Sequence, residues 1–281
     1  MQYNPIIFFQ SFLQLIRWPN LLMMALSQLL VLKFVVHQDI SDPKFWAILF
    51  STLIIGAAGY IINDYFDIKI DLVNKPQKVI IGRIIRRRTA IIIHQIFNVI
   101  GCLVGLWVSK WVFLINVLSV SLLWIYSSYF KKKPFIGNLI VAFLSALALG
   151  VLGIYYQTNT SVVFFYSLFA FQISLIREII KDIEDIRGDM RHGCRTLPIV
   201  WGIRNTKTLL YLLILIFVVL IFGWVFQSNI LLIQLYFGAI FGMTAFLSYQ
   251  LYWADTRKKF YFLSQFCKLI MLVGILSMVL I

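Results

Sequence analysis

Long apolar stretches separated by short polar segments run through the whole chain. Each stretch has about the 20 residues that an α-helix needs to cross the hydrocarbon core of a bilayer, and the short alternating segments of a transmembrane β-barrel are not seen. We therefore predict an all-α, polytopic membrane protein, a bundle of about nine transmembrane helices. The expected spans are residues 16–36, 44–63, 89–109, 111–129, 134–156, 161–181, 207–226, 230–253 and 260–281.

The polar segments between these spans do not divide the chain into domains. No Pro- or Gly-rich linker interrupts it, and no polar segment is long enough to fold by itself, so residues 1–281 are expected to form a single transmembrane domain. Two connections, after the second and the sixth span, stand out at about 25 residues each, and we expect both to be long cytoplasmic loops. Gly188 and Gly193 are expected to break the chain in the second of them.

Basic residues outside the spans lie mainly in alternate connections. The segments after the second, fourth, sixth and eighth spans hold most of the Lys and Arg of the chain, whereas the opposite connections contain only Lys44 and Lys110. Cytoplasmic loops of membrane proteins are enriched in Lys and Arg. We therefore expect an integral protein of the inner (plasma) membrane, with a cytoplasmic N-terminus and an external C-terminus.

The composition agrees with a membrane protein. Hydrophobic residues make up 61% and charged residues 13% of the chain, against about 25% charged in a typical soluble domain. The net charge of +14 does not indicate nucleic-acid binding, because the aromatic residues lie inside the apolar stretches and the basic ones between them. Membrane lipids are the expected surroundings, and no obligatory protein partner is evident.

The acidic residues are concentrated at two places. The chain has 11 of them, and eight follow or end the second and sixth spans. Within each group the aspartates are three or four residues apart, which places them on one face of a helix, where like charges repel each other. Some positive charge must offset this repulsion. The two groups are Asp64, Asp67 and Asp71, and Glu178, Asp182, Glu184, Asp185 and Asp189.

Two interpretations of these acidic groups are possible. In the first, neighbouring basic residues such as Lys69, Lys75, Lys181, Arg187 and Arg191 neutralise ordinary helix ends. In the second, two facing sets of oxygen ligands hold Mg²⁺ ions that bind a diphosphate. The repetition of the pattern on the same side of the membrane favours the second interpretation.

Three segments resemble the motifs of UbiA-type intramembrane prenyltransferases. NDYFDIKID (63–71) is similar to their first aspartate motif, KDIEDIRGDMRHGCRTLP (181–198) to their second, and IYSSYFKK (125–132) to the Tyr-Ser and Lys element after the fourth helix. The resemblance extends over essentially the whole chain. One departure is NKPQKVIIGR (74–83), in which Lys78 and Val79 replace an Arg and a Pro that are common in the family.

The resemblance implies a Mg²⁺-dependent enzyme that transfers a polyprenyl group from its diphosphate to a lipophilic acceptor. The residues that it implies as metal ligands are Asn63, Asp64, Asp67, Asp71, Asp182, Asp185 and Asp189. The residues that it implies for diphosphate binding are Lys78, Arg83 and Lys131, and those for catalysis are Asp67, Asp182, Lys131 and Tyr126.

The acceptor is the open question at this stage. The form IIKDIEDIRGD is most similar to the branch that prenylates geranylgeranylglycerol phosphate, which implies geranylgeranyl diphosphate as donor and an ether lipid as product. The alternative acceptor is an aromatic acid of quinone biosynthesis. A membrane transporter is the alternative from another class, because acidic residues within membrane helices also mark ion pathways.

Overall fold

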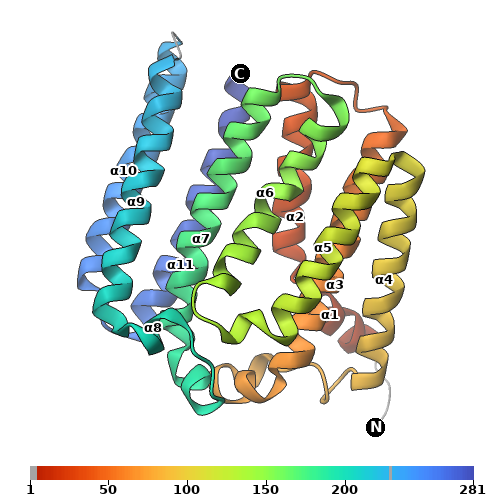
Figure 1. Ribbon diagram of the computed structural model, residues 1–281, viewed down its shortest axis with the longest axis vertical. Helices are drawn as coiled ribbons and strands as arrows, with labels where there is room; N and C mark the ends of the chain where they lie inside the picture. The colour runs from red at the N-terminus through yellow and green to blue at the C-terminus, as the bar shows by residue number, and fades with distance from the viewer. Residues whose placement is uncertain (1–4, 228–229) are drawn as a thin grey trace.

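The computed structural model describes residues 5–227 and 230–281, and these form one bundle of helices (Figure 1). Nine helical segments in this part of the chain are long and apolar enough to cross a membrane, as the sequence predicted. The helices are α1 (Pro5–Leu15), α2 (Trp18–Leu30, prolonged by the π-helical turn Val31–Val36), α3 (Pro43–Asn74), α4 (Arg87–Val108), α5 (Lys110–Ser128), α6 (Ile136–Tyr156), α7 (Thr160–Arg191), α8 (Leu197–Val200), α9 (Gly202–Gln227), α10 (Leu231–Trp253) and α11 (Arg257–Leu276).

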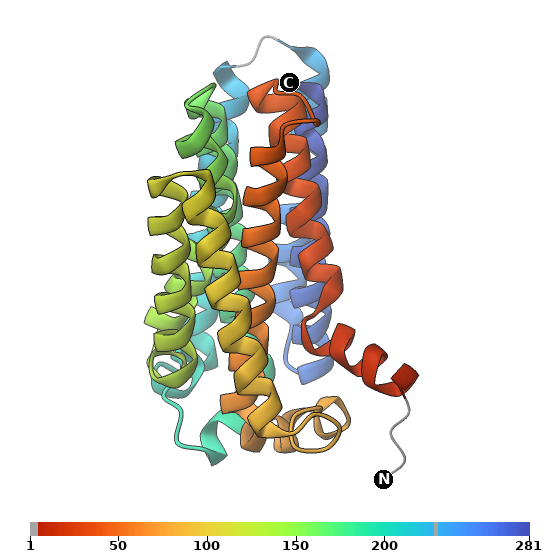
Figure 2. The ribbon, with the colours of Figure 1, turned by 90° about the vertical axis from the view of Figure 1, so that its right-hand side faces the viewer.

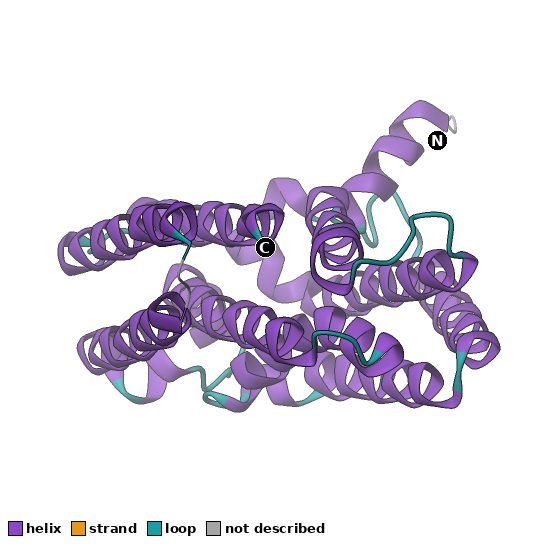
Figure 3. Cartoon of the chain, turned by 90° about the horizontal axis from the view of Figure 1, so that it is seen from above, coloured by secondary structure: helices purple, strands orange, loops and turns teal. Residues whose placement is uncertain are grey.

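The spanning helices form an elongated ring when they are viewed along their axes (Figure 3). Each helix from α2 to α7 contacts the next, α9 and α10 continue the series, and α11 closes it against α2. α3 and α7 are the most buried spans, and they contact each other in the interior. A residue on the facing sides of α3 and α7 therefore lies inside the protein, whereas the outer sides of the ring are apolar and exposed, as lipid contact requires.

The two ends of the bundle differ. The short helices α1 and α8 and the C-terminal end of α3 lie at one end, and the C-terminus of the chain lies at the other (Figure 1). α1 projects sideways from that first end (Figure 2). Because the described residues include nine spanning helices, an odd number, α1 and the C-terminus lie at opposite ends of the bundle.

α3 and α7 are longer than the apolar pattern indicated. Their expected spans end at residues 63 and 181, but the helices continue to Asn74 and Arg191. Both aspartate motifs therefore lie on regular helix, and the irregular connections are shorter than the predicted loops. Hydropathy changes where the chain leaves the lipid, whereas the helical hydrogen bonds continue for roughly 15 Å beyond that point.

The expected break at Gly188 is also absent. α7 runs through this buried residue and ends three residues later, and Gly193 follows the helix with a positive φ of 69°. Of these two glycines, Gly193 alone is therefore in a conformation that glycine favours over other residues.

Candidate active site

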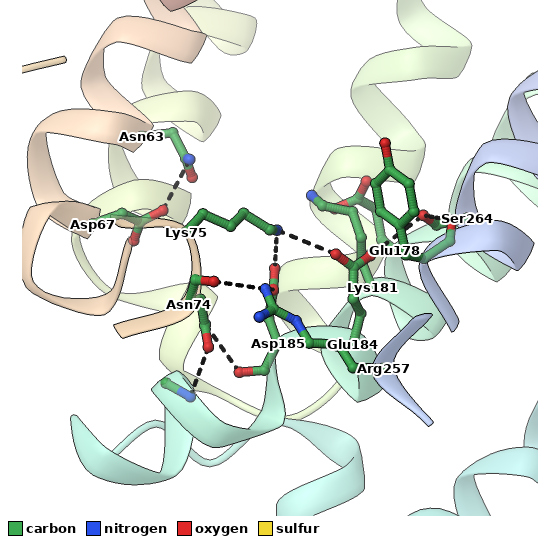
Figure 4. A network of polar contacts seen from close by, with 12 residues as sticks. Asn63, Asp67, Asn74, Lys75, Glu178, Lys181, Glu184, Asp185, Arg257 and Ser264 are labelled. Carbon is green, nitrogen blue, oxygen red and sulfur yellow. Dashed lines mark hydrogen bonds and ion pairs between the residues drawn. The ribbon is translucent and has the colours of Figure 1, made fainter. Parts of the chain in front are cut away.

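Asn74, the last residue of α3, joins the ends of α3 and α7. Its side-chain amide donates to the backbone oxygen of Asp185 (3.1 Å), and its side-chain oxygen accepts from the backbone N–H of Gly188 (3.0 Å; Figure 4). A Cβ at position 188 would overlap the Asn74 side chain, so the close approach requires glycine. The Arg257 guanidinium also donates to the Asn74 backbone oxygen (2.8 Å). These contacts bring the two aspartate motifs together.

Asp67 is the central carboxylate of the α3 motif. It is 4% exposed, forms an ion pair with Lys131, and accepts a hydrogen bond from the Asn63 amide (2.9 Å). Lys131 belongs to the 3₁₀ turn Phe130–Lys132 between α5 and α6, and it also donates to Asn63 Oδ1 (3.1 Å). Burial opposes the charged form of Lys131, but the negative charge of Asp67 outweighs it, so the pKa of Lys131 lies above its ordinary value. Lys131 is thus a fixed positive charge.

Asp64, on the same helix, has a different partner. Its carboxylate pairs with the guanidinium of Arg17, which directly precedes α2, at 2.8 Å. Burial opposes the charge of Arg17, but the attraction of Asp64 is among the stronger effects that raise its pKa above the ordinary value. The guanidinium also lies over the ring of Tyr60, 4.9 Å from its centroid. Asp64 and Asp67 therefore share a helix but are each neutralised from a different element.

The α7 motif is held by both amides and cations. The Asn138 amide of α6 donates to Asp182 (2.8 Å). Lys75 pairs with Asp185 at 2.7 Å and lies 3.5 Å from Glu184, as Figure 4 shows. The second Asp185 oxygen is buried, and no described residue forms a hydrogen bond with it, although Arg257 lies 3.7 Å away.

A cavity of about 300 Å³ opens beside these carboxylates and extends into the bundle. Asn63, Lys131 and the rings of Tyr60 and Tyr126 line the end next to the motifs. Further along, the lining is mostly apolar and comes from α2, α3, α5, α6, α7 and α11. Its size lies within the range of small-molecule binding sites. The lining suits a molecule with a charged head and an apolar tail.

Comparison with known proteins identifies the family. The model of the UbiA prenyltransferase family matches residues 21–267. The chain belongs to this family. The chain is 34% identical to a digeranylgeranylglyceryl phosphate synthase of Methanobrevibacter smithii, over 73% of this chain and 74% of the relative. It is 31% identical to the enzyme of the same name from Sulfurisphaera tokodaii, over 79% and 81%.

Solved structures agree on the fold. One described as giving insights into digeranylgeranylglyceryl phosphate synthase in membranes covers 97% of this chain and 98% of its own, with a TM-score of 0.77 and 24% identity. A UbiA homologue from Archaeoglobus fulgidus, bound to DMAPP and Mg²⁺, covers 96% of this chain and 100% of its own, with a TM-score of 0.68 and 17% identity. The UbiA resemblance and the all-α membrane fold are thereby confirmed, and membership of an enzyme family favours catalysis over transport.

Not every residue implied by the UbiA resemblance lies at the cavity. Lys78 and Arg83 are exposed on the connection after α3, and neither belongs to the cavity lining. Arg83 donates to the backbone oxygen of Pro76 (2.8 Å). Tyr126 and Lys131, by contrast, both face the cavity.

Sequence reasoning missed several polar residues that the structure places at the site. Arg17 and Asn74 were overlooked because their partners are distant in sequence. Three others stand within apolar stretches, and a polar residue in a membrane span is a signal that could have found them. These are Asn138, Arg177 and Lys268.

The residues at the ends of α3 and α7 have the chemistry that a UbiA-type metal site needs. Carboxylate and amide oxygens are the ligands that Mg²⁺ prefers, and Asp185 supplies a buried oxygen without a hydrogen bond. In the described residues, no three acidic, His or Cys side chains are grouped closely enough to hold an ion. The ammonium groups of Lys131 and Lys75 instead occupy positions beside the carboxylates. The types of ligand, rather than the present grouping of the side chains, therefore fit a divalent cation, and the two lysines supply positive charge there.

Proposed function

We propose that the protein transfers a geranylgeranyl group from geranylgeranyl diphosphate to a hydroxyl of geranylgeranylglyceryl phosphate, forming an ether. The names of the relatives at 31–34% identity support this pair of substrates. The observation that carries the proposal is one cavity that has Asn63 and Lys131 at one end and a mostly apolar lining deeper in the bundle. Such a cavity matches a substrate whose diphosphate is polar and whose isoprenoid tail is not.

The carboxylate end is the proposed site of the diphosphate. Magnesium bound there would supply positive charge that stabilises the leaving diphosphate. The A. fulgidus homologue bound to DMAPP and Mg²⁺ supports binding of a prenyl diphosphate together with magnesium. The residues proposed to hold the metal are Asn63, Asp64, Asp67 and Asp71 of α3, and Asp182, Asp185 and Asp189 of α7.

Side chains at the cavity would promote the transfer itself. Lys131 stabilises the negative charge that develops as the allylic C–O bond breaks and the electron pair leaves with the diphosphate. The acceptor hydroxyl oxygen then bonds to the allylic carbon, and its proton leaves with the released diphosphate. The rings of Tyr60 and Tyr126 provide electron-rich faces beside the carbon that becomes positive, and the apolar lining excludes water.

The test is product formation by the purified protein in detergent with Mg²⁺ and geranylgeranyl diphosphate. Geranylgeranylglyceryl phosphate and an aromatic acid are supplied in parallel, and the products are identified by mass. A metal-dependent ether with the phosphate acceptor supports the proposal. Prenylation of the aromatic acid alone would reject the acceptor but keep the prenyltransferase, and release of no pyrophosphate under any condition would reject both.

The arrangement of basic residues also supports an orientation. We infer that the N-terminus and the carboxylate end face the cytoplasm of a cell bounded by the inner (plasma) membrane, because the connections at that end carry most of the Lys and Arg. The variants Lys78→Cys and Lys110→Cys test this. The inference requires that a membrane-impermeant thiol reagent added to intact cells labels the new cysteine of Lys110→Cys and not that of Lys78→Cys.

A further inference from the structure

A second charged region lines the same cavity. It consists of Arg177 and Lys181 on α7 and Lys268 on α11, and Glu178 is the only acidic residue among the described residues that line the cavity. Arg177 and Lys181 both contact the Glu178 carboxylate, the latter at 3.2 Å. Lys268 donates to Asn20 Oδ1 (3.0 Å). We call Arg177, Lys181 and Lys268 the cation cluster.

Two members of the cation cluster, Arg177 and Lys268, lie deeper in the bundle than the aspartates. Arg177 precedes Asp182 by five residues of helix, or about 7.5 Å along α7. Lys268 is 11 residues inside α11, or roughly 16 Å from its first residue, Arg257. Positive charges at this depth are costly in a membrane protein, and they mark a ligand site unless fixed negative charges neutralise them.

The fixed negative charges do not neutralise the cluster. The other two cations of the lining, Arg17 and Lys131, already pair with Asp64 and Asp67. Glu178 then stands against three cations, which leaves two positive charges at the cavity wall. The Nε of Arg177 is buried and has no hydrogen-bond partner among the described residues. The excess charge and this free donor together make the cluster suited to bind an anion with about two negative charges.

We infer that the cation cluster binds the phosphate monoester of the acceptor, while the donor diphosphate binds at the aspartates. This rests on the proposed function. A phosphate monoester carries about −1.5 to −2 charges at neutral pH and three acceptor oxygens, which matches the excess charge of the cluster. Lys and Arg bind phosphate directly, so this anion needs no metal ion.

The position of the cluster suits an acceptor. Lys268 contacts Asn20, and the Asn20 amide donates to the Tyr60 hydroxyl (3.2 Å). Tyr60 lies about one turn of α3 before Asn63. A phosphate at the cluster therefore lies in the cavity that Asn63 and Lys131 border, on the side away from the connection after α3. The glycerol hydroxyls of the acceptor would extend from there towards the allylic carbon.

The decisive experiment compares Lys268→Met with the native protein on two acceptors, geranylgeranylglyceryl phosphate and the same alcohol without its phosphate. Loss of a charge-assisted hydrogen bond to the phosphate should raise the KM for the phosphorylated acceptor about 10- to 100-fold. The KM for geranylgeranyl diphosphate and that for the unphosphorylated alcohol should stay within about twofold, which is within the factor expected for an untouched contact. Lys268→Arg, which keeps the charge, should restore most of the affinity.

The side chain of methionine is close in size to that of lysine, and removing one charge from a positively charged cluster leaves no uncompensated anion, so Lys268→Met should fold. Lys259→Met is the matched control, because Lys259 is exposed and pairs with Asp255 outside the cavity. Binding of the phosphorylated acceptor without metal or donor gives a second measurement. It should weaken by the same factor in Lys268→Met.

The possible failures can be told apart. An increase in the KM for the donor diphosphate, or an equal increase for both acceptors, would reject the assignment of the acceptor phosphate to the cluster. If the native protein forms no ether product, the proposed function fails. The metal-free binding measurement then decides the inference, and binding unchanged in Lys268→Met would reject it.

Discussion

The carboxylate region beside the cavity and the cation cluster in its lining carry opposite excess charge. At the ends of α3 and α7, carboxylates are in excess on each helix face, and cations from other elements offset them, chiefly Lys131 and Lys75. On α7 just before these carboxylates, at Arg177 and Lys181, cations are in excess, and Glu178 offsets only part of their charge. The two regions adjoin, because Lys181 directly precedes Asp182.

The difference indicates how each anion is bound. A carboxylate surface repels a diphosphate unless divalent cations lie between them, so the first region is suited to a substrate that arrives with metal. A cationic surface attracts phosphate without metal, so the second is suited to a substrate that arrives alone. Two phosphorylated lipids can then share one cavity without exchanging places, and the predictions below test this separation.

The largest expected effect comes from removing the central carboxylates. Asp67→Ala and Asp182→Ala should each lower kcat by about 10²- to 10³-fold or more, because each removes one of the oxygens that we propose as ligands for the metal charge that stabilises the leaving group. The measurement is ether formation at saturating substrates. Asp255→Ala, which changes an exposed aspartate paired with Lys259, is the control and should keep its activity. More than about a tenth of native activity in either site variant would contradict the carboxylate assignment, since that loss is too small for such a role.

Lys131→Met should have the next largest effect, and it should appear in stability as well as in turnover. The variant leaves the buried Asp67 without its cation, which should cost about 3 kcal/mol in the free energy of unfolding. Because the pKa of Lys131 is raised, the native ion pair is fully formed below the ordinary lysine pKa and is lost only as the pH rises through the higher value. The stability difference should therefore be constant between pH 7 and 9.

Thermal unfolding in detergent measures this difference. Lys132→Met is the matched control, because the neighbouring lysine is exposed. Added Mg²⁺ should recover part of the lost stability if Asp67 is a metal ligand. A variant as stable as the native protein would show that the Lys131 pair does not hold the connection between α5 and α6 in place.

Gly188→Ala tests the joint between the two motif helices and should have a smaller effect. The added methyl group would overlap the Asn74 side chain and should cost about 1–3 kcal/mol in stability. Gly238→Ala in α10 is the control, since its new methyl group meets nothing and should be neutral or slightly stabilising. Equal unfolding temperatures for the two variants would show that the Asn74 contact is dispensable.

Much of this arrangement could be predicted from the sequence. Apolar length gave the spans, and the i, i+3, i+7 spacing of Asp64, Asp67 and Asp71 correctly placed them on one helix. The separate partners of Asp64 and Asp67 could not be predicted, because Arg17 and Lys131 lie 47 and 64 residues away and reach α3 only after the helices pack. Gly188 was misjudged for a related reason. Local sequence suggests a helix break there, whereas the need for glycine comes from Asn74, 114 residues away.

Burial distinguishes basic residues for which the sequence predicted the same role. We expected three residues at the diphosphate, Lys78, Arg83 and Lys131. Of these, only Lys131 lines the cavity, and the other two are exposed on the connection after α3. Their role as diphosphate contacts stays a proposal. An exposed charge contributes at most about 1 kcal/mol, because water screens it.

The smallest expected effect therefore belongs to Lys78→Met and Arg83→Met. Each should raise the KM for the donor diphosphate by no more than about fivefold, which corresponds to that 1 kcal/mol, and should leave the KM for the phosphorylated acceptor unchanged. Steady-state kinetics with each substrate varied in turn separates the two constants, with Lys110→Met at the opposite end of the bundle as control. A loss as large as that of Lys131→Met would mean that the connection after α3 closes over the diphosphate. In that case the carboxylate region, unlike the cation cluster, would be completed only when its substrate binds.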